Sequence, residues 1–239
     1  MSKIALITGA SRGLGAELAG FLAEQGYDLV LTSRAAQSLA TVARSLDRFG
    51  GRIVARAGDV ADAAHRRTLA EAVESLGGLD VLVNNASELG ASPLPALAEY
   101  PLDTLERVFR VNVLAPVGLV QATLPLLKRS RGLVVNVSSD AALGGYPGWG
   151  GYGASKAALD LASLTLANEL RDDGVAVVSV DPGDMRTQMH QDAFPGEDIT
   201  DRPLPRVTLP FWAWLLGQDR MLVSGRRYRA QSDRWEVAA

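Results

Sequence analysis

A tyrosine and a lysine four residues apart, Tyr152 and Lys156, are the residues of this sequence best placed to move a proton. Residues at i and i+4 share one helix face, so the lysine ammonium can lie against the phenol. A phenol with an ordinary pKa of about 10 exchanges protons slowly at neutral pH, but a neighbouring cation lowers that pKa. The spacing therefore predicts that Lys156 makes Tyr152 a usable acid and base. Ser139 ends an apolar, strand-like run a short distance before the tyrosine.

A glycine-rich turn, Thr8-Gly9-Ala10-Ser11-Arg12-Gly13-Leu14-Gly15, lies between the first apolar run and the first helical pattern. Glycines let backbone amides approach a pyrophosphate, and the N-terminus of the following helix adds a positive dipole. After the second strand, an acidic residue would bind a ribose 2′-hydroxyl, whereas this chain has Ser33-Arg34. Arg34, with Arg12 as a second cation, therefore predicts a 2′-phosphate and NADP(H) as the cofactor. A plain tight turn and a solvated Arg34 are the alternatives.

Short apolar runs alternate with longer helical patterns along the chain. This alternation predicts βαβ units and a parallel sheet, and continuously apolar runs are typical of strands buried on both faces. We predict a Rossmann-type doubly wound α/β fold with about seven parallel strands, helices on both faces and one domain over residues 1–239. The expected strands lie near residues 3–8, 27–33, 52–57, 80–84, 132–138 and 175–181.

Two segments are expected to be irregular. Residues 141–151 contain closely spaced glycines and predict a mobile loop that leads into the Tyr152 helix. Residues 187–220 are rich in proline and predict a substrate lid.

Composition excludes several classes of protein. The net charge of -3 and the scattered basic residues indicate no nucleic-acid partner. The chain has no cysteine, which excludes disulfides, thiolate metal sites and a cysteine nucleophile. No signal-peptide pattern or membrane-spanning run is apparent, so we expect a soluble, cytoplasmic protein without a membrane partner. His65 and His190 are not at ligand spacing, which predicts surface histidines and no metal, although His190 could contact a substrate.

These ordered motifs resemble the compact single-domain branch of the short-chain dehydrogenase/reductase family over nearly the whole chain. The resemblance implies a catalytic group of Asn112, Ser139, Tyr152 and Lys156. It implies cofactor contacts at Gly9, Ser11, Arg12, Gly13, Leu14, Gly15, Ser33, Arg34, Asp59, Val60, Asn85, Ala86, Tyr152, Lys156, Pro182, Gly183 and Thr187. Ser87 stands where the family usually has glycine, after Asn84-Asn85-Ala86, and we expect the change to be tolerated.

The resemblance also implies the chemistry. Hydride passes between a nicotinamide and a carbonyl carbon while Tyr152 exchanges a proton with the oxygen and Ser139 donates a hydrogen bond to it. Lys156 is expected to hold the nicotinamide ribose as well, and Asn112 to position a water beside Lys156. The family usually forms tetramers through helices that correspond here to residues 102–128 and 152–171, so a homodimer or homotetramer is expected.

The expected substrate is a small carbonyl compound or secondary alcohol. The residues expected around its carbonyl are mostly apolar, which predicts an uncharged, largely hydrophobic molecule: Ala141, Leu143, Trp149, Met189 and Phe194. A 3-oxoacyl-acyl carrier protein reductase is an alternative, because Lys128, Arg129 and Arg131 could receive an acidic carrier, although they could equally complement the negative end of a helix. A non-catalytic dinucleotide-binding sensor is the alternative from another class.

The last expected strand lies in the stretch Val223–Arg229, which has the family's Ser-Gly turn and an unusual density of arginine: Arg226, Arg227 and Arg229. We expect a solvated basic face there, with a subunit interface as the alternative.

Overall fold

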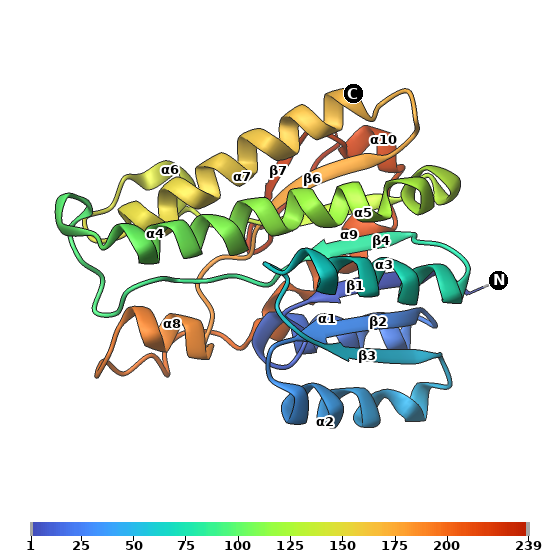
Figure 1. The fold of residues 1–239 in the computed structure, drawn as a ribbon, viewed down its shortest axis with the longest axis horizontal. Helices are drawn as coiled ribbons and strands as arrows, with labels where there is room; N and C mark the ends of the chain where they lie inside the picture. Colours follow the sequence, from blue (N-terminus) through green and yellow to red (C-terminus); the bar gives the residue numbers. More distant parts are fainter. Residues whose placement is uncertain (1, 238–239) are drawn as a thin grey trace.

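The computed structural model describes residues 2–237, which form a parallel sheet of seven strands in the order β3-β2-β1-β4-β5-β6-β7 (Figure 1). The strands are β1 (Ile4–Thr8), β2 (Asp28–Ser33), β3 (Ile53–Ala57), β4 (Val81–Asn84), β5 (Leu133–Val137), β6 (Ala176–Asp181) and β7 (Arg227–Arg229). The predicted doubly wound fold is confirmed, and the six strands that were given bounds lie within one residue of them.

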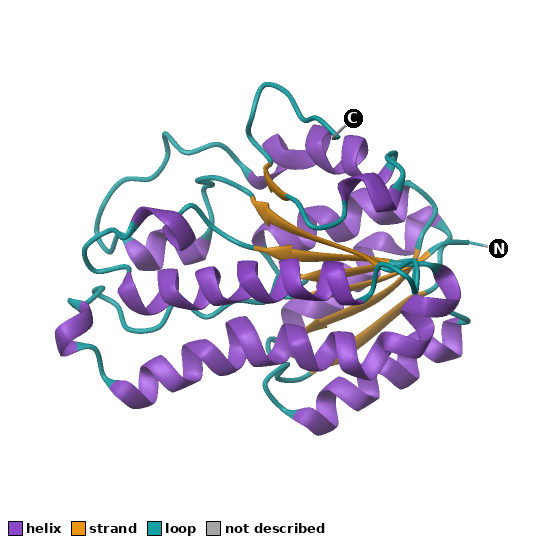
Figure 2. Ribbon diagram, turned by 90° about the horizontal axis from the view of Figure 1, so that it is seen from above, coloured by secondary structure: helices purple, strands orange, loops and turns teal. Residues whose placement is uncertain are grey.

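Helices cover both faces of the sheet, as the view along its edge shows (Figure 2). One face carries α1 (Gly13–Glu24), α2 (Ala36–Leu46) and α9 (Leu209–Leu216), and the other carries α3 (Ala63–Leu76), α5 (Ala115–Ser130) and α7 (Gly150–Glu169). The shorter helices are α4 (Leu102–Phe109), α6 (Ala141–Gly144), α8 (Gln188–Ala193) and α10 (Arg220–Val223).

Each central strand contributes side chains to two cores, because successive residues of a strand point to opposite faces. Leu6 packs with the α3 and α5 side, whereas Ile7 packs with the α1 side, and neither is exposed. Fully burying a leucine or isoleucine contributes about 1.5–3 kcal/mol, so these continuous apolar runs hold the sheet between its helical layers. The packing explains why the strands could be read from uninterrupted apolar runs.

The strand order reverses at β1, which lies between β2 and β4. The chain builds β1, β2 and β3 outward in one direction and then crosses back to build β4 through β7 on the other side. In open parallel sheets the crevice at such a reversal, beyond the carboxyl ends of the strands, is where ligands bind. The fold therefore brings together the segments that follow β1, β2, β4, β5 and β6.

Two irregular segments differ from expectation. The predicted loop 141–151 begins with the short helix α6, and α7 already starts at Gly150. The predicted lid 187–220 includes α9, whose Phe211 and Trp212 are buried in the core against the sheet. That half of the segment is therefore not a lid. Phe211 lies within 6 Å, between ring centroids, of four other aromatic rings: Trp212, Trp214, Tyr228 and Trp235.

A long helical segment runs from α4 through a π-helical turn, Arg110–Leu114, into α5. By length and composition alone, residues 102–130 would suit a membrane span, which the sequence analysis does not predict. Half of its most apolar stretch is buried inside the domain, and α5 packs on α3 and β5 as a core helix does. The π-helical turn places Asn112, and single-turn π-bulges are frequent at functional sites.

Candidate active site

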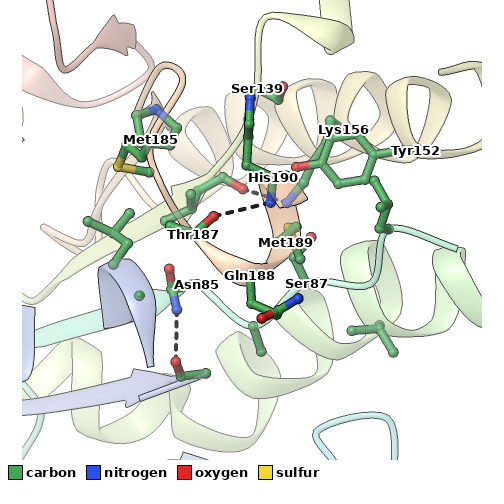
Figure 3. Close-up of a pocket in the computed structure, with 18 of the residues that line it drawn as sticks. Asn85, Ser87, Ser139, Tyr152, Lys156, Met185, Thr187, Gln188, Met189 and His190 are labelled. Atoms are coloured by element: carbon green, nitrogen blue, oxygen red, sulfur yellow. Dashed lines mark hydrogen bonds between the residues drawn. The ribbon is translucent and has the colours of Figure 1, made fainter. Parts of the chain in front are cut away.

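A cavity of about 710 Å³ lies at the carboxyl ends of the strands (Figure 3). Its walls come from the β1–α1 turn, from the residues that follow β2, β4, β5 and β6, and from the first turns of α7 and α8. Most of the sequence-predicted site residues line it. The exceptions are Gly15 and Asn112, which lie directly behind the wall.

Tyr152 and Lys156 occupy the first turns of α7 and are both buried. The Lys156 ammonium donates a hydrogen bond of 2.7 Å to the carbonyl oxygen of Val137, at the end of β5. Its Nζ atom lies 5.5 Å from the centroid of the Tyr152 ring. The i and i+4 spacing brings the two side chains together as predicted.

Burial dominates the electrostatics of this pair. Loss of solvent raises the pKa of Tyr152 to about 12, whereas hydrogen bonds with the hydroxyls of Ser87 and Ser139 oppose that rise. Loss of solvent also lowers the pKa of Lys156 to about 8, against the pull of the Asp160 carboxylate. The pKa of Tyr152 therefore lies above its ordinary value rather than below it, because loss of solvent outweighs the interactions that favour the phenolate. The phenol is protonated at neutral pH and is poised as a donor.

We expect the parent protein to gain stability relative to a Lys156→Met variant as the pH rises from about 8 to about 10. In that window the folded lysine, with its pKa near 8, is losing its proton, while the unfolded chain, at its ordinary value of 10.5, still holds one. The unfolded state binds more protons there, so raising the pH favours folding. Below pH 8 the cost of the buried charge is fully present and is about 3 kcal/mol. Both proteins keep Tyr152, so its raised pKa affects both stabilities and largely cancels from the difference.

Urea unfolding of both proteins at pH 7, 8, 9 and 10 measures this effect. A difference between their free energies of unfolding that stays constant over the series would contradict it.

Ser139 follows β5 and faces the cavity on the same side as Tyr152 (Figure 3). Its hydroxyl donates to the carboxylate of Asp140 at 3.0 Å and accepts from the backbone amide of Ala141 at 3.2 Å. To donate to a substrate oxygen, the hydroxyl must therefore leave Asp140, which requires only rotation about its Cβ–Oγ bond.

Asn112 anchors the segment that follows β4. Its Oδ1 accepts from the amide of Glu88 at 2.7 Å and from the hydroxyl of Ser87 at 3.1 Å. Its Nδ2 donates to the carbonyl of Glu88 and to the hydroxyl of Ser155, both at 2.9 Å. An amide side chain offers two donors and two acceptor lone pairs, so every position is used. The expected water beside Lys156 cannot be held by this side chain.

The glycines of the β1–α1 turn allow its backbone to pack closely against the residues that follow β4. A Cβ on Gly15 would collide with the backbone of Gly9, and Gly9 itself has a φ of 68°. Asn85 fixes the contact by donating from Nδ2 to the carbonyl of Thr8 at 2.9 Å. The start of α1, at Arg12, has no side-chain cap, so its first amides remain available to an anion.

Two arginines flank the far end of the cavity. Arg34 pairs with Glu88 at 3.2 Å through a side chain that is 60 % exposed. Arg12 has no ion-pair partner among residues 2–237. Ser33 and Ser11 line the wall between them, beside Asp59 and Val60. This is the arrangement that an oxyanion with more than one negative charge would require.

The carboxylate of Asp59 is fixed by two partners within the protein. It accepts from the amide of Ala61 at 2.9 Å and pairs with Arg107 at 2.6 Å. These contacts hold its pKa below the ordinary range despite partial burial. Arg107 was not foreseen, because the two residues are far apart in the chain and no local pattern connects them.

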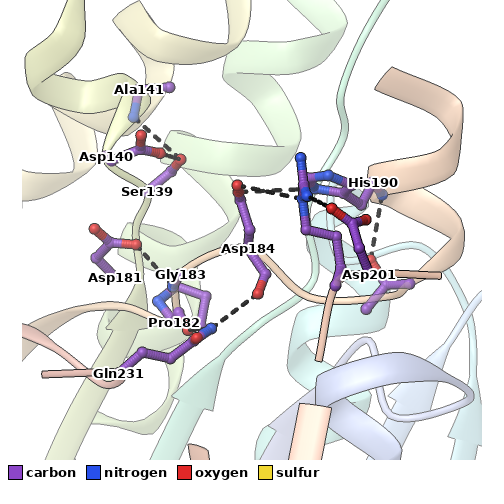
Figure 4. A network of polar contacts seen from close by, with 12 residues as sticks. Ser139, Asp140, Ala141, Asp181, Pro182, Gly183, Asp184, His190, Asp201 and Gln231 are labelled. Carbon is purple, nitrogen blue, oxygen red and sulfur yellow. Dashed lines mark hydrogen bonds and ion pairs between the residues drawn. The ribbon is translucent and has the colours of Figure 1, made fainter. Parts of the chain in front are cut away.

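The segment after β6 closes the other side of the cavity (Figure 4). Asp181 accepts from the amide of Gly183 at 3.0 Å, and Gly183 has a φ of 74°, which favours glycine. Thr187 caps α8 by accepting from the amide of His190 at 3.2 Å. Pro182, Gly183 and Thr187 all line the cavity, as the sequence predicted.

The remaining wall is apolar and aromatic. The Trp149 ring lies 5.8 Å from Tyr152 and 6.0 Å from Phe194, between centroids. Ala141 and Met189 also line the cavity, whereas Leu143 is 74 % exposed and lies outside the lining, contrary to expectation. The apolar wall lies next to the Tyr152 hydroxyl and therefore surrounds the place where a carbonyl would be protonated.

The two histidines are not surface residues. His65 shares a hydrogen bond of 2.8 Å with Thr32, and the His190 side chain is 10 % exposed in the cavity wall. No group of acidic residues and histidines suited to a metal occurs within residues 2–237.

Comparison with known proteins identifies the family to which this fold and site belong. The family model described as short chain dehydrogenase matches residues 3–198. The chain belongs to the short-chain dehydrogenase family. A short chain dehydrogenase of Shigella flexneri complexed with NADP superposes with a TM-score of 0.89 at 32% sequence identity, covering 96% of this chain and 97% of the other.

Two curated relatives are similar over most of their length. A benzil reductase of Saccharomyces cerevisiae, which forms (S)-benzoin, is 35% identical over 222 residues, covering 87% of this chain and 82% of the relative. The 3-oxoacyl-[acyl-carrier-protein] reductase of rhamnolipid biosynthesis in Pseudomonas aeruginosa is 37% identical over 195 residues, covering 78% and 74%. This short-chain dehydrogenase is therefore an oxidoreductase by family.

Ser87 stands where the resemblance implied a glycine. Its hydroxyl donates to Oδ1 of Asn112 at 3.1 Å, lowers the pKa of Tyr152 against the effect of burial, and lines the cavity. Sequence reasoning noted the substitution but assigned the side chain no contacts. No local pattern connects residues 87 and 152, so only the fold reveals this role of Ser87.

Proposed function

We propose that this short-chain dehydrogenase is an NADP(H)-dependent oxidoreductase that reduces the carbonyl of a small, largely apolar ketone or oxidises the corresponding secondary alcohol. The observation that carries the proposal is the convergence of Ser139, Tyr152 and Lys156 on one cavity that also reaches the glycine turn and Arg34.

The cavity residues fit a dinucleotide. The uncapped start of α1 suits a pyrophosphate, and Arg12 and Arg34 suit a 2′-phosphate at the adenosine end. Asp59 and Val60 would lie against the adenine, while Asn85, Ala86, Pro182, Gly183 and Thr187 would surround the nicotinamide end. The Shigella flexneri neighbour complexed with NADP supports the same cofactor here. When bound, the dinucleotide supplies or accepts the hydride.

The protein supplies the proton and the position. Tyr152, protonated at neutral pH, donates to the oxygen of the substrate, and the Ser139 hydroxyl turns from Asp140 to share that oxygen. Lys156, with its pKa near 8, offers a cation that stabilises the tyrosinate left behind. The aromatic rings of Trp149 and Phe194 give the site an apolar wall.

The substrate class is tested by following NADPH oxidation with four kinds of carbonyl compound. A diaryl diketone represents the benzil reductase relative, an aliphatic ketone represents a small apolar substrate, a keto acid tests charge, and a 3-oxoacyl carrier thioester tests the carrier alternative. We expect turnover of the apolar ketones. Turnover confined to the keto acid or to the carrier thioester would contradict the proposed substrate class.

The carrier alternative has little support near the cavity. Lys128 pairs with Asp173 at 2.7 Å, in the last turn of α5. That turn precedes β5, whereas the cavity lies beyond the other end of β5, so these basic residues are at the opposite edge of the sheet. The sensor alternative would need the glycine turn but not a serine, tyrosine and lysine in the same cavity.

We predict that the protein is a homodimer or homotetramer. The α5 and α7 helices run side by side on one face of the molecule (Figure 1), and exposed leucines lie on and beside them: Leu114 at 60 %, Leu161 at 66 % and Leu164 at 45 %. Such a patch on a soluble protein usually marks an interface. Light scattering at micromolar concentration should report at least twice the monomer mass, and Leu161→Glu should lower it. Val207→Glu, an exposed control on another surface, should not, and a monomeric parent would disprove the prediction.

Cytoplasmic localisation is part of this proposal, and a chain without cysteine is compatible with that reducing compartment.

A further inference from the structure

Arg227, in the edge strand β7, is enclosed by the catalytic elements. The sequence predicts a solvated charge there, but the side chain is 22% exposed, whereas Arg226 and Arg229 on either side are exposed. β7 pairs with β6 so that Arg227 lies beside Ser179, and the side chain extends beneath the cavity.

Its guanidinium bonds to three elements of the site at once. Nη2 donates to the backbone carbonyl of Ser139 at 2.8 Å, and Nε donates to the carboxylate of Asp160 at 3.0 Å. Nη2 also lies 3.5 Å from the carboxylate of Asp181. Asp160 and Asp181 are buried more deeply than the arginine, at 16% and 3% exposure. The contacts therefore lie in a region where charge pairing is strong.

The three acceptors lie on three segments whose relative positions determine the geometry of the active site. Ser139 carries the hydroxyl that faces Tyr152, and Asp181 opens the Asp181-Pro182-Gly183 segment of the cavity wall (Figure 4). Asp160 lies one helical turn beyond Lys156 on α7. A guanidinium has five donors in a rigid fork, so it can fix all three acceptors, whereas a lysine ammonium is a flexible point charge.

We propose that Arg227 is a positioning residue, which holds the Ser139 backbone against α7 and β6 so that the Ser139 hydroxyl faces the oxygen of the substrate. This proposal rests on the proposed function. Arg227 touches neither substrate nor cofactor, so it acts on the reaction through Ser139.

An ion pair that merely stabilises the fold makes a different prediction. Loss of a purely structural ion pair would lower the stability of the whole protein. Its effect on kcat would then be the same whether or not the Ser139 hydroxyl is present. A positioning residue loses its effect when that hydroxyl is removed, because nothing remains to be positioned. A double-mutant cycle with Ser139→Ala separates the two.

The experiment compares the parent, Arg227→Lys, Ser139→Ala and the double variant, with an apolar ketone and NADPH. We expect Arg227→Lys to lower kcat about tenfold, because the substitution would displace the Ser139 hydroxyl by a fraction of an ångström. We expect KM for the ketone and the dissociation constant for NADPH to stay within about threefold. In the Ser139→Ala background the lysine substitution should cost less than about twofold.

Arg226→Lys, one residue away on the same strand, is the matched control and should leave kcat unchanged. If Arg227→Lys fails to fold, Arg227→Gln keeps a planar donor group without the charge and leaves Asp160 beside Lys156 unchanged, and the same cycle applies. Full activity in the arginine variants, or an equal loss in the Ser139→Ala background, would overturn the proposal. An inactive parent would instead overturn the proposed function and this proposal with it.

Discussion

Replacing Tyr152 with phenylalanine is expected to lower kcat by a factor of about 10² to 10⁴, because the variant lacks the proton donor. The loss corresponds to roughly 3 to 5 kcal/mol of transition-state stabilisation. The phenyl ring keeps the shape of the buried side chain and its edge contact with Trp149, so NADPH binding should stay within about threefold. Steady-state rates and a fluorescence titration of NADPH measure the two quantities separately.

Two further variants sharpen this result. Lys156→Ala should weaken both turnover and NADPH binding, because the lysine has two roles. Tyr146→Phe removes another hydroxyl from the cavity wall, on a side chain that is 46 % exposed, and should leave kcat within about threefold. A Tyr152→Phe variant that kept more than about a tenth of the parent rate would show that another group donates the proton.

Changing Ser33 to aspartate is expected to invert the cofactor preference. The parent should bind NADPH at least tenfold more tightly than NADH, a difference of about 1.4 kcal/mol, because Arg34 and Arg12 can pair with the 2′-phosphate. The Arg34–Glu88 pair does not prevent this, because an ion pair with a side chain 60 % exposed is worth about 0–1 kcal/mol. An aspartate at residue 33 repels the phosphate and accepts a hydrogen bond from the 2′-hydroxyl instead.

Dissociation constants of both dinucleotides, measured for both proteins, test this inversion. Thr41→Asp places the same charge on the exposed surface of α2 and should leave the preference unchanged, which controls for a general charge effect. Equal affinities of the parent for NADPH and NADH would refute the assignment of Arg34.

The strands were predictable because each one is a continuous run of apolar residues, as a strand buried on both faces requires. Val81–Asn84 is apolar throughout apart from its last residue, since both faces of that strand are covered. The helix α9 was not predictable by the same means. Its sequence, Leu209–Leu216, is apolar all round and contains Pro210, so neither helical periodicity nor the absence of proline identified it. Pro210 lies in the first turn, where a proline is tolerated.

The site was predictable in its membership but less so in its energetics. Spacing alone indicated that Tyr152 and Lys156 would meet, because the helix fixes that distance. The pKa of Tyr152 depends instead on how completely distant segments remove its solvent, which local sequence does not record. The burial of Arg227 could not be predicted for the same reason. Its partner Asp160 is 67 positions earlier, and only the fold brings the two together.

The distribution of tryptophan has a spectroscopic consequence. Of the four tryptophans, Trp212, Trp214 and Trp235 lie in or beside the aromatic cluster around Phe211, on the α9 side of the sheet. Trp149 alone is in the cavity wall, among the described residues. Intrinsic emission therefore has two separable sources, one that follows the melting of the α9 layer and one that follows occupation of the cavity. A Trp149→Phe variant would retain the first signal and lose most of the second.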